Sequence, residues 1–305
     1  MLDEANEIVL CRARRSLKRP DATWPEFPVP GDLVEWQPLE ETGKRSGVIE
    51  VVQPRTSEIA RERSGHRKQV VVANLDQLVA VIALRDPRLD RGLLDRLLAT
   101  AESTGISVRI CLHKVDLVQS GDFEDLRQVY ESAGYPVLFT SVATGQGISE
   151  LKDVLRDHLS AFMGPSGAGK SHLISELQPG LQLKTGLVSE KTGHGQHTTT
   201  RVELHPTDFG AILADTPGVR GFSLWDMPPE ELGRLFPEVR RYQGECHFST
   251  CQHDSEPDCA VKQQVESGGM DAGRYRSYLV TLEELRQAQK EADSKGKRPK
   301  LRRGT

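Results

Sequence analysis

The chain has 305 residues, of which 37% are hydrophobic and 28% charged, and its formal net charge at pH 7 is −4. A chain of this length and composition can bury a core, and we expect two or three domains. It contains no run of eighteen apolar residues and no apolar stretch near its acidic N-terminus, which excludes helical membrane spans and a secretory signal. We therefore expect a soluble protein of the cytoplasm.

Basic residues crowd both ends of this acidic chain. Because basic tails attract polyanions, the pattern favours a partner such as RNA, although tails that are merely solvated and disordered have the same composition. The two groups are Arg12, Arg14, Arg15, Lys18 and Arg19 near one end, and Lys295, Lys297, Arg298, Lys300, Arg302 and Arg303 near the other.

The first 74 residues divide into a tail and a small β-domain. Residues 1–30 are charged and contain four prolines, as is typical of a tail. Three β-like runs follow at 32–36, 47–52 and 69–73. The loop between the last two runs suits a phosphate backbone, although arginine is common on any protein surface. Its basic residues are Arg55, Arg61, Arg63, Arg67 and Lys68.

Strands and helices alternate in the next part of the chain. Residues 78–84 form an apolar run of the kind found in parallel strands buried on both faces, and 108–112 resemble it. Helical spacing of leucines appears over 90–103 and again over 148–159. This repetition predicts an α/β sheet with right-handed crossovers and a ligand at the carboxyl ends of its strands.

A base-reading motif follows the strand that ends at Leu112. The segment 113–117 reads His-Lys-Val-Asp-Leu, where GTP-binding proteins have N-K-x-D. The Asp116 carboxylate would accept hydrogen bonds from guanine N1–H and the 2-amino group, which adenine lacks, and Lys114 would lie along the base. The next strand, 136–140, leads into Ser141 and Val142, whose backbone N–H would donate to guanine O6.

A phosphate-binding loop comes after these segments. It matches G-x-x-x-x-G-K-[ST], with an apolar run before it and a helical pattern after it, although a Gly-rich surface turn is the alternative. Lys170 would reach the β and γ oxygens of a nucleotide, and Ser171 would hold Mg²⁺. The nucleotide-contacting set is Gly164, Pro165, Ser166, Gly167, Ala168, Gly169, Lys170, Ser171 and the next residue, His172.

Two further segments complete the phosphate end of this predicted site. Residues 212–215 form a strand that ends in D-x-x-G, where Asp215 would bind the Mg²⁺ site through water and the Gly218 N–H would meet the γ-phosphate. The Gly- and Thr-rich stretch 191–200 suits a loop that becomes ordered when a threonine reaches Mg²⁺. We favour Thr199 as that ligand, with Thr198 and Thr200 as alternatives.

Motif order places the base-reading segments before the phosphate loop, which is a circular permutation of the ordinary G domain. In this order and in its motifs the chain resembles the circularly permuted, ribosome small-subunit-dependent GTPases (RsgA/YjeQ). The resemblance implies a tail (1–30), an N-terminal OB-fold β-barrel (31–74), a permuted P-loop G domain (75–225) and a C-terminal helical zinc-binding domain with a basic tail (226–305). It also implies a monomeric GTPase that binds the small ribosomal subunit and its rRNA, acts in late assembly, and hydrolyses GTP to GDP faster on the subunit.

A metal site is indicated independently by the C-terminal part of the chain. Three of the five cysteines and one histidine fit C-x₄-C-x-H-x₅-C, a complete tetrahedral set for structural zinc, with buried reduced thiols as the alternative. The four residues are Cys246, Cys251, His253 and Cys259. The helix expected from residue 271 to about 292 carries Arg274 and Arg276 near two tyrosines as candidate RNA contacts.

Two departures from the family pattern, and one from GTPases in general, bear on mechanism. His113 replaces the usual Asn, which predicts a weaker tie between the base-reading and phosphate loops and a lower nucleotide affinity. Val142 replaces Ala, with little effect on a backbone contact. Val219 follows D-x-x-G where many GTPases have a water-orienting Gln, so intrinsic hydrolysis should be slow. His197 would then orient or deprotonate the attacking water once a partner orders its loop, or it only packs there.

Other functions remain open at this point. The phosphate loop also resembles those of nucleoside monophosphate kinases and ATP-binding cassette proteins, which do not explain the K-x-D segment. An RNA-binding scaffold with a degenerate nucleotide site is a second alternative, supported by His113 and Val219. A permuted GTPase that acts on the large ribosomal subunit is a third.

Overall fold

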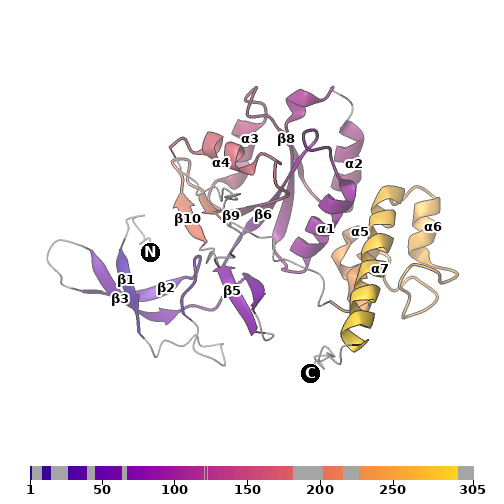
Figure 1. Ribbon diagram of the computed structural model, residues 1–305, viewed down its shortest axis with the longest axis horizontal. Helices are drawn as coiled ribbons and strands as arrows, with labels where there is room; N and C mark the ends of the chain where they lie inside the picture. Colours follow the sequence, from indigo (N-terminus) through magenta and orange to yellow (C-terminus); the bar gives the residue numbers. More distant parts are fainter. Residues whose placement is uncertain are drawn as a thin grey trace, which may run out of the picture.

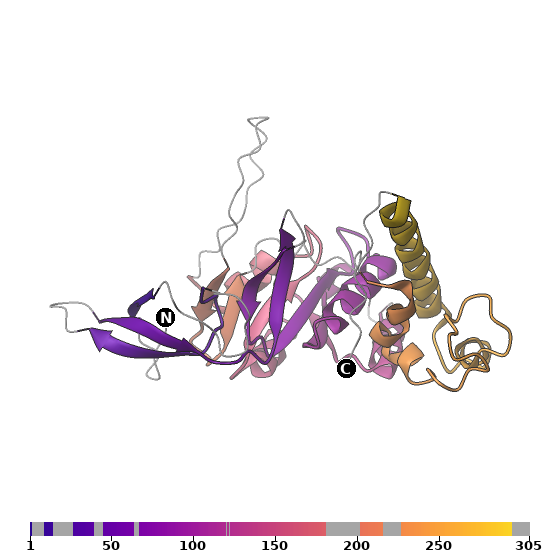
Figure 2. The same ribbon diagram turned by 90° about the horizontal axis from the view of Figure 1, so that it is seen from below.

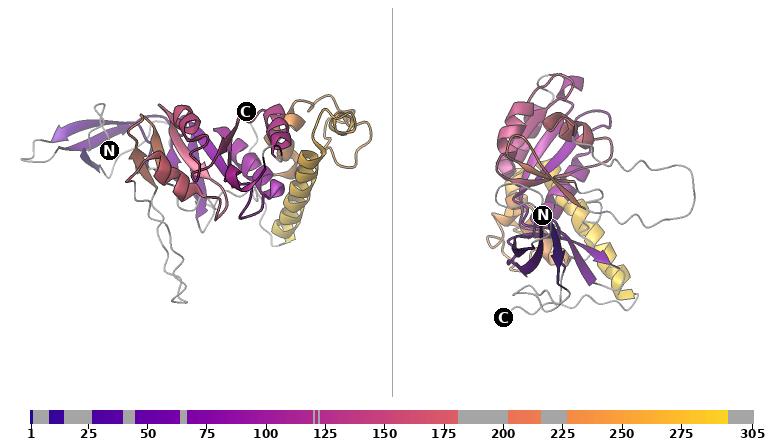
Figure 3. Two further views of the ribbon diagram at one scale, coloured as in Figure 1. Left: turned by 90° about the horizontal axis from the view of Figure 1, so that it is seen from above. Right: turned by 90° about the vertical axis from the view of Figure 1, so that its left-hand side faces the viewer.

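The computed structural model describes residues 1, 9–14, 27–39, 45–63, 67–119, 121, 123–180, 202–215 and 227–294. Two small β-sheets near the N-terminus are followed by a six-stranded sheet flanked by helices and then by a helical C-terminal region (Figure 1). The N-terminal sheets and the long last helix lie at opposite ends of an elongated molecule (Figures 2 and 3). Within these residues, no helix has the length and hydropathy needed to cross a membrane.

The first sheet contains a strand in the segment predicted to be a tail. Strand β1 (Leu10–Ala13) pairs in parallel with β3 (Ser46–Val52), and β2 (Val34–Leu39) pairs with the other edge of β3. Cys11 and Ala13 alternate inward and pack against Ile49 and Val52. The tail prediction is therefore wrong for residues 10–13. Their apolar residues alternate with arginines, so the basic composition of the segment concealed the strand pattern.

The second sheet is a hairpin of β4 (Glu58–Arg63) and β5 (Arg67–Ala73), and β4 occupies part of the predicted basic loop. Ile59 and Val72 face each other across the hairpin and join the core of the central sheet. An OB-fold also has five strands. In the described ranges, however, hydrogen bonds join these five strands as two sheets, so a closed barrel stays a prediction.

The central sheet has the strand order β10-β11-β9-β6-β7-β8. All neighbours are parallel except the edge strand β10. Because parallel strands end at the same edge, the segments that follow them converge there, as predicted. The strands are β6 (Gln77–Ala83), β7 (Ser107–His113), β8 (Val137–Thr140), β9 (Leu159–Met163), β10 (Glu203–Pro206) and β11 (Ile212–Asp215).

Helices cover both faces of this sheet. Alternate residues of the fully buried β6 point to opposite faces, so that Leu78 belongs to one hydrophobic cluster and Val79 to the other. Helices α1 (Arg91–Glu102) and α2 (Glu124–Ala133) contribute to the first cluster, and α3 (Ile148–Leu155) and α4 (Lys170–Leu177) contribute to the second. The predicted doubly covered α/β sheet is thus present.

One predicted helix is too long. The helix predicted over 148–159 ends at Leu155, and Leu159 begins β9, where its N–H donates to the Asp76 carboxylate at 2.7 Å. Leu159 continues the four-residue spacing of the helix face, so periodicity could not separate it from the helix. Asp157, with φ +59°, interrupts the helical backbone between the two elements.

The C-terminal region has its own hydrophobic core against α1. It comprises η4 (Pro229–Leu235), α5 (Pro237–Arg240), α6 (Ala260–Glu266) and α7 (Ala272–Ser294). Phe236 and Tyr278 pack edge to face, with ring centroids 5.3 Å apart, and Ala99 of α1 belongs to the same cluster. This core attaches the region to the α1 side of the central sheet.

Candidate nucleotide and metal sites

The two predicted base-reading segments meet at the carboxyl edge of the sheet. Strand β7 ends at His113, and Lys114 adopts a left-handed backbone, φ +62°, that turns the chain into the short helix η1 (Val115–Leu117). The exposed Asp116 accepts a hydrogen bond from the Ser141 hydroxyl at 2.5 Å. Two residues that the sequence separates by 25 positions therefore form one unit.

The loop after β8 is closed around Ser141. The Ser141 hydroxyl accepts the Thr144 N–H at 3.2 Å, and the Ser141 N–H donates to the Gln146 carbonyl at 3.0 Å. Within the described part of the chain, the Val142 N–H has no hydrogen-bond partner, while its side chain packs against the core. Asp116 is thus held by a hydrogen-bonded turn in which the Val142 N–H is left free to donate.

The phosphate loop connects β9 to α4 with close backbone contacts. A Cβ atom at Gly164 would lie only 2.1 Å from the Val81 carbonyl oxygen, so the loop needs glycine there. The Lys170 ammonium donates to the carbonyls of Gly164 and Pro165, both at 2.8 Å, and so lies within the loop.

The other residues of the predicted set take the positions that a strand–loop–helix connection gives them. Ala168 is buried in the core, whereas Ser166, Gly167, Ser171 and His172 are exposed at the carboxyl edge of the sheet or on the first turn of α4. An exposed helix N-terminus of this kind attracts anions because its first N–H groups have no helical partner.

Lys114 joins the base-reading loop to the phosphate loop. Its ammonium donates to the Gly167 carbonyl at 2.9 Å and also to the Asp86 carbonyl, after β6. His113, the residue before it, is buried, and burial together with the charge of Lys114 lowers its pKa. Its imidazole is therefore neutral at pH 7.

Several predicted catalytic residues lie outside the described residues. They are His197, Thr198, Thr199, Thr200, Gly218 and Val219. Asp215 is the last residue of β11 and pairs with Glu203 of β10. Because β11 is parallel to β9, Asp215 ends its strand at the edge where the phosphate loop begins.

The four predicted metal ligands converge. The ligand atoms of Cys246, Cys251, His253 and Cys259 all lie within 4.8 Å of one another. His253 Nδ1 is 3.5 Å from the Cys246 sulfur and 3.4 Å from the Cys259 sulfur. Burial raises the pKa of Cys251 to about 12 and lowers that of His253. Such a cluster can hold a metal ion.

Helix α7 supports the metal-binding loop from behind. The Tyr275 hydroxyl donates to the His253 carbonyl at 2.7 Å, and the Tyr278 hydroxyl donates to the Gln252 carbonyl at 2.9 Å. His253 itself has a left-handed backbone, φ +60°, which these bonds help to hold. The two tyrosines thus position the site rather than lie free on the surface.

Comparisons with known proteins agree with this geometry. Residues 52–225 match the model of the RsgA GTPase family. The chain belongs to the RsgA GTPase family. The small ribosomal subunit biogenesis GTPase RsgA of Caldanaerobacter subterraneus subsp. tengcongensis is 40% identical over 283 residues, which cover 93% of this chain and 90% of that protein. Its counterpart in Gemmatimonas aurantiaca is 43% identical over 236 residues, or 77% of each chain.

Two solved structures have the same fold. YjeQ from Thermotoga maritima superposes with a TM-score of 0.75 at 34% identity and covers 93% of this chain and 92% of its own. YloQ, described as a circularly permuted GTPase, gives 0.73 at 29% identity, with 94% and 90% covered. The predicted RsgA family and its permuted motif order are confirmed, and the chain is a GTP hydrolase.

Two arginines predicted to contact RNA are buried in this RsgA-family chain. Arg274 is 1% exposed and forms ion pairs with Asp95 and Glu238. The Arg55 side chain is 3% exposed and binds both carboxylate oxygens of Asp32, at 2.7 and 2.9 Å. Both predictions are wrong, because a buried carboxylate partner far away in sequence cannot be read from local charge patterns.

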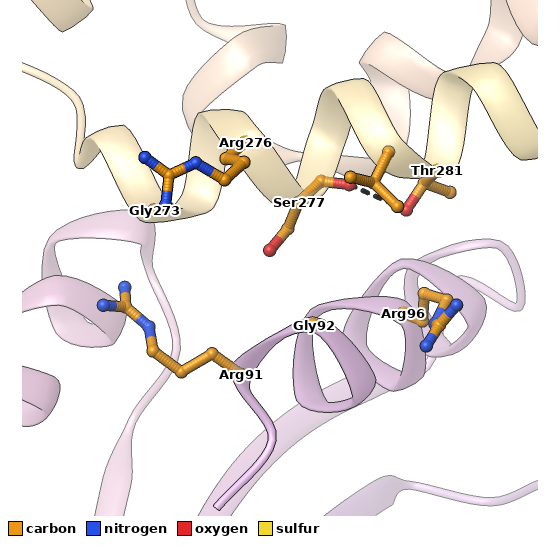
Figure 4. Close-up of a pocket in the computed structure, with 8 residues that line it drawn as sticks. Arg91, Gly92, Arg96, Gly273, Arg276, Ser277 and Thr281 are labelled. Atoms are coloured by element: carbon orange, nitrogen blue, oxygen red, sulfur yellow. Dashed lines mark hydrogen bonds between the residues drawn. The ribbon is translucent and has the colours of Figure 1, made fainter.

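A cavity of about 310 Å³ lies between α1 and α7, lined in part by Arg91, Arg96 and Arg276 (Figure 4). Arg91 pairs with Asp271 at 2.6 Å and Arg96 pairs with Glu284 at 2.8 Å. Since two of its three arginines already bind carboxylates of the C-terminal region, we interpret this cavity as part of the junction between the two regions.

Proposed function

We propose that this RsgA-family GTPase binds the small ribosomal subunit and its rRNA and hydrolyses GTP to GDP during late maturation of that subunit, in the cytoplasm. The observation that carries the proposal is the joining of Asp116, Ser141 and the phosphate loop at one sheet edge, with Lys114 donating to Gly167. The relatives named above are small ribosomal subunit biogenesis GTPases, which supports the choice of partner.

The described residues suit guanine recognition. Asp116 is fixed by Ser141 with carboxylate capacity left to accept two base donors, and the Val142 N–H beside it is free to donate to O6. Lys114 lies between this loop and the phosphate loop, so its stem can cover the base while its ammonium holds Gly167. A kinase that reads adenine has no use for a fixed carboxylate there.

The phosphate loop would hold the β- and γ-phosphates through Lys170 and the first N–H groups of α4. Mg²⁺ bound with GTP would neutralise charge that develops on the phosphates, and Ser171 with Thr199 would be its side-chain ligands. We assign Asp215 to the outer shell of that ion and the Gly218 N–H to the γ-phosphate.

For hydrolysis, we assign water activation to His197 on the Thr-rich loop. Val219 has no group that can align water, so intrinsic turnover is slow and a partner that orders the loop accelerates it. His197→Ala should lower subunit-stimulated kcat by about 100-fold, the usual size of a general-base contribution. His194→Ala, in the same loop, is the matched control. Unchanged stimulated turnover in His197→Ala would rule out this role.

The metal in the C-terminal cluster is zinc in this proposal. In a tetrahedral zinc site with Zn–S bonds of about 2.3 Å, two sulfur ligands lie about 3.8 Å apart. The Cys246 and Cys259 sulfurs are 3.8 Å apart, and the sulfur-to-Nδ1 distances are slightly shorter, as the shorter Zn–N bond requires. Because protein atoms supply all four ligands, the ion would stabilise the fold and not catalyse.

The domain limits are part of the proposal. We assign 31–74 to an OB-fold, 75–225 to the permuted G domain and 226–305 to the zinc-binding domain, with strand β1 added to the OB-fold from the N-terminal tail. We assign RNA contacts to the exposed Arg276, to Arg61, Arg63, Arg67 and Lys68 and to the basic terminal segments, since the side chains of the other two candidates, Arg55 and Arg274, are buried.

Cosedimentation with purified small subunits tests the choice of partner. We expect the protein to pellet with small subunits in the presence of a non-hydrolysable GTP analogue, and to stay in the supernatant with GDP or with large subunits. Equal binding to large subunits would favour the alternative in which the GTPase acts there.

A further inference from the structure

One imidazole lies where three elements of the nucleotide site meet. His113 is the last residue of β7 and is 3% exposed. The end of β8 lies on one side of its ring and the start of α4 on the other. Strand β8 leads directly into Ser141, and α4 begins with Lys170 and Ser171, the last residues of the phosphate loop.

On the β8 side, His113 holds a strand end through a hydrogen bond. Its Nδ1 is 2.9 Å from the Thr140 hydroxyl, which is fully buried and also 3.1 Å from the Cys111 sulfur. Thr140 is followed directly by Ser141, the residue that fixes Asp116. A change at His113 would therefore reach the base-reading carboxylate through two short contacts.

On the α4 side, the His113 ring packs against the backbone of Gly169, which has no side chain. A Cβ atom at Gly169 would lie 2.6 Å from His113 Cδ2 and 2.9 Å from Nε2, closer than real Cβ contacts allow. Gly169 has φ +93° and caps α4, whose first N–H groups would face the phosphates. The ring therefore limits how closely the phosphate loop can approach β7.

We propose that His113 is a positioning residue that sets the base-reading strands and the phosphate loop relative to each other. The imidazole does so through a hydrogen bond to Thr140 and a packing contact with Gly169. The hydrogen bond from Lys114 to Gly167 is a separate connection between the two loops. The inference rests on the proposed assignment of this edge as the GTP site. The sequence predicts a weaker tie between the base-reading and phosphate loops because His113 replaces Asn. In this proposal the imidazole of His113 supplies that tie by other contacts.

The test measures GDP affinity and GTP turnover for variants of His113 in the full-length protein. His113→Ala removes both contacts and should raise the Kd for GDP and the KM for GTP about tenfold, with kcat within threefold, because the ring touches no reacting atom. His113→Asn retains a partner for Thr140 and should recover most of the loss. His158→Ala, which changes an exposed histidine directly before β9, is the control.

A second pair of variants separates positioning from general stability. Thr140→Val keeps the side-chain shape and removes the hydrogen bond, so it should raise the Kd in the same direction, and combining it with His113→Ala should add little. Wild-type Kd in His113→Ala, or a Kd of His113→Asn no better than that of His113→Ala, would overturn the inference. Failure of the unchanged protein to bind GDP or GTP would instead overturn the proposed function itself.

Discussion

Arg274 of α7 donates to the Asp95 carboxylate of α1 at 2.7 Å, and neither side chain is more than 2% exposed. The same guanidinium binds both oxygens of Glu238, at 2.6 and 3.1 Å, and the Tyr130 hydroxyl of α2 donates to Asp95 at 2.9 Å. This network connects the C-terminal region to the helices on one face of the central sheet. The region is therefore fastened to that face, in addition to following β11 in the chain.

Loss of Arg274 should destabilise the protein strongly. Arg274→Met leaves two buried carboxylates without their cation, a kind of change that costs about 3–5 kcal/mol. Arg276→Met, at an exposed side chain two positions away in the same helix, should change the unfolding free energy by less than about 0.5 kcal/mol. Chemical denaturation of both variants measures the difference. Equal stabilities would mean that the network contributes little.

The α1–α7 junction should keep its geometry in both nucleotide states. Since β11 leads toward the C-terminal region, one hypothesis is that nucleotide state repositions that region and the N-terminal β-domain together. The buried network predicts that the C-terminal region moves only as one body with α1. Spin labels at the exposed Ser103 and Val280 should give the same distance with GDP and with a GTP analogue. A nucleotide-dependent distance would contradict this.

Base selectivity should depend on Ser141 as well as on Asp116. Asp116→Asn exchanges an acceptor for a donor and should shift preference from GTP to xanthosine triphosphate. Ser141→Ala removes the 2.5 Å bond that orients the carboxylate and should raise the KM for GTP about tenfold while guanine remains preferred. Competition binding with both nucleotides checks these outcomes. Unaltered guanine selectivity in Asp116→Asn would mean that the base site is elsewhere.

Metal content and pH should be linked through the thiols. Without metal, burial raises the pKa of Cys251 to about 12, so that thiol is protonated at pH 7 and metal binding must release its proton. Affinity for zinc should therefore rise with pH and fall on acidification. Metal analysis should find one zinc per chain, lost in Cys259→Ser and kept in Cys11→Ser, whose thiol lies outside the cluster. Zinc retained in Cys259→Ser would contradict the assignment.

Local patterns were enough to predict that the base-reading and phosphate loops meet at one edge of the sheet. The residues of the base-reading and phosphate loops each follow a buried strand directly, and parallel strands bring such segments together whatever the details of packing. The convergence of the four candidate metal ligands could be predicted for a similar reason, because four residues within a stretch of fourteen need only a short loop to converge.

Contacts between distant residues could not be predicted in this way. Arg274 and Arg55 have the same local surroundings as exposed arginines, and only their partners Asp95 and Asp32 show that they are buried. Leu159 satisfies both a helical and a strand pattern, and its pairing with Ile212 decides between them. The contact between His113 and Gly169 likewise depends on how two loops approach each other.

Nucleotide turnover with and without purified small ribosomal subunits tests the central claim most directly. The account predicts slow GTP hydrolysis by the protein alone, a marked increase in kcat on addition of small subunits, and no comparable turnover of ATP. Preference for ATP, or no GTP turnover in either condition, would contradict it.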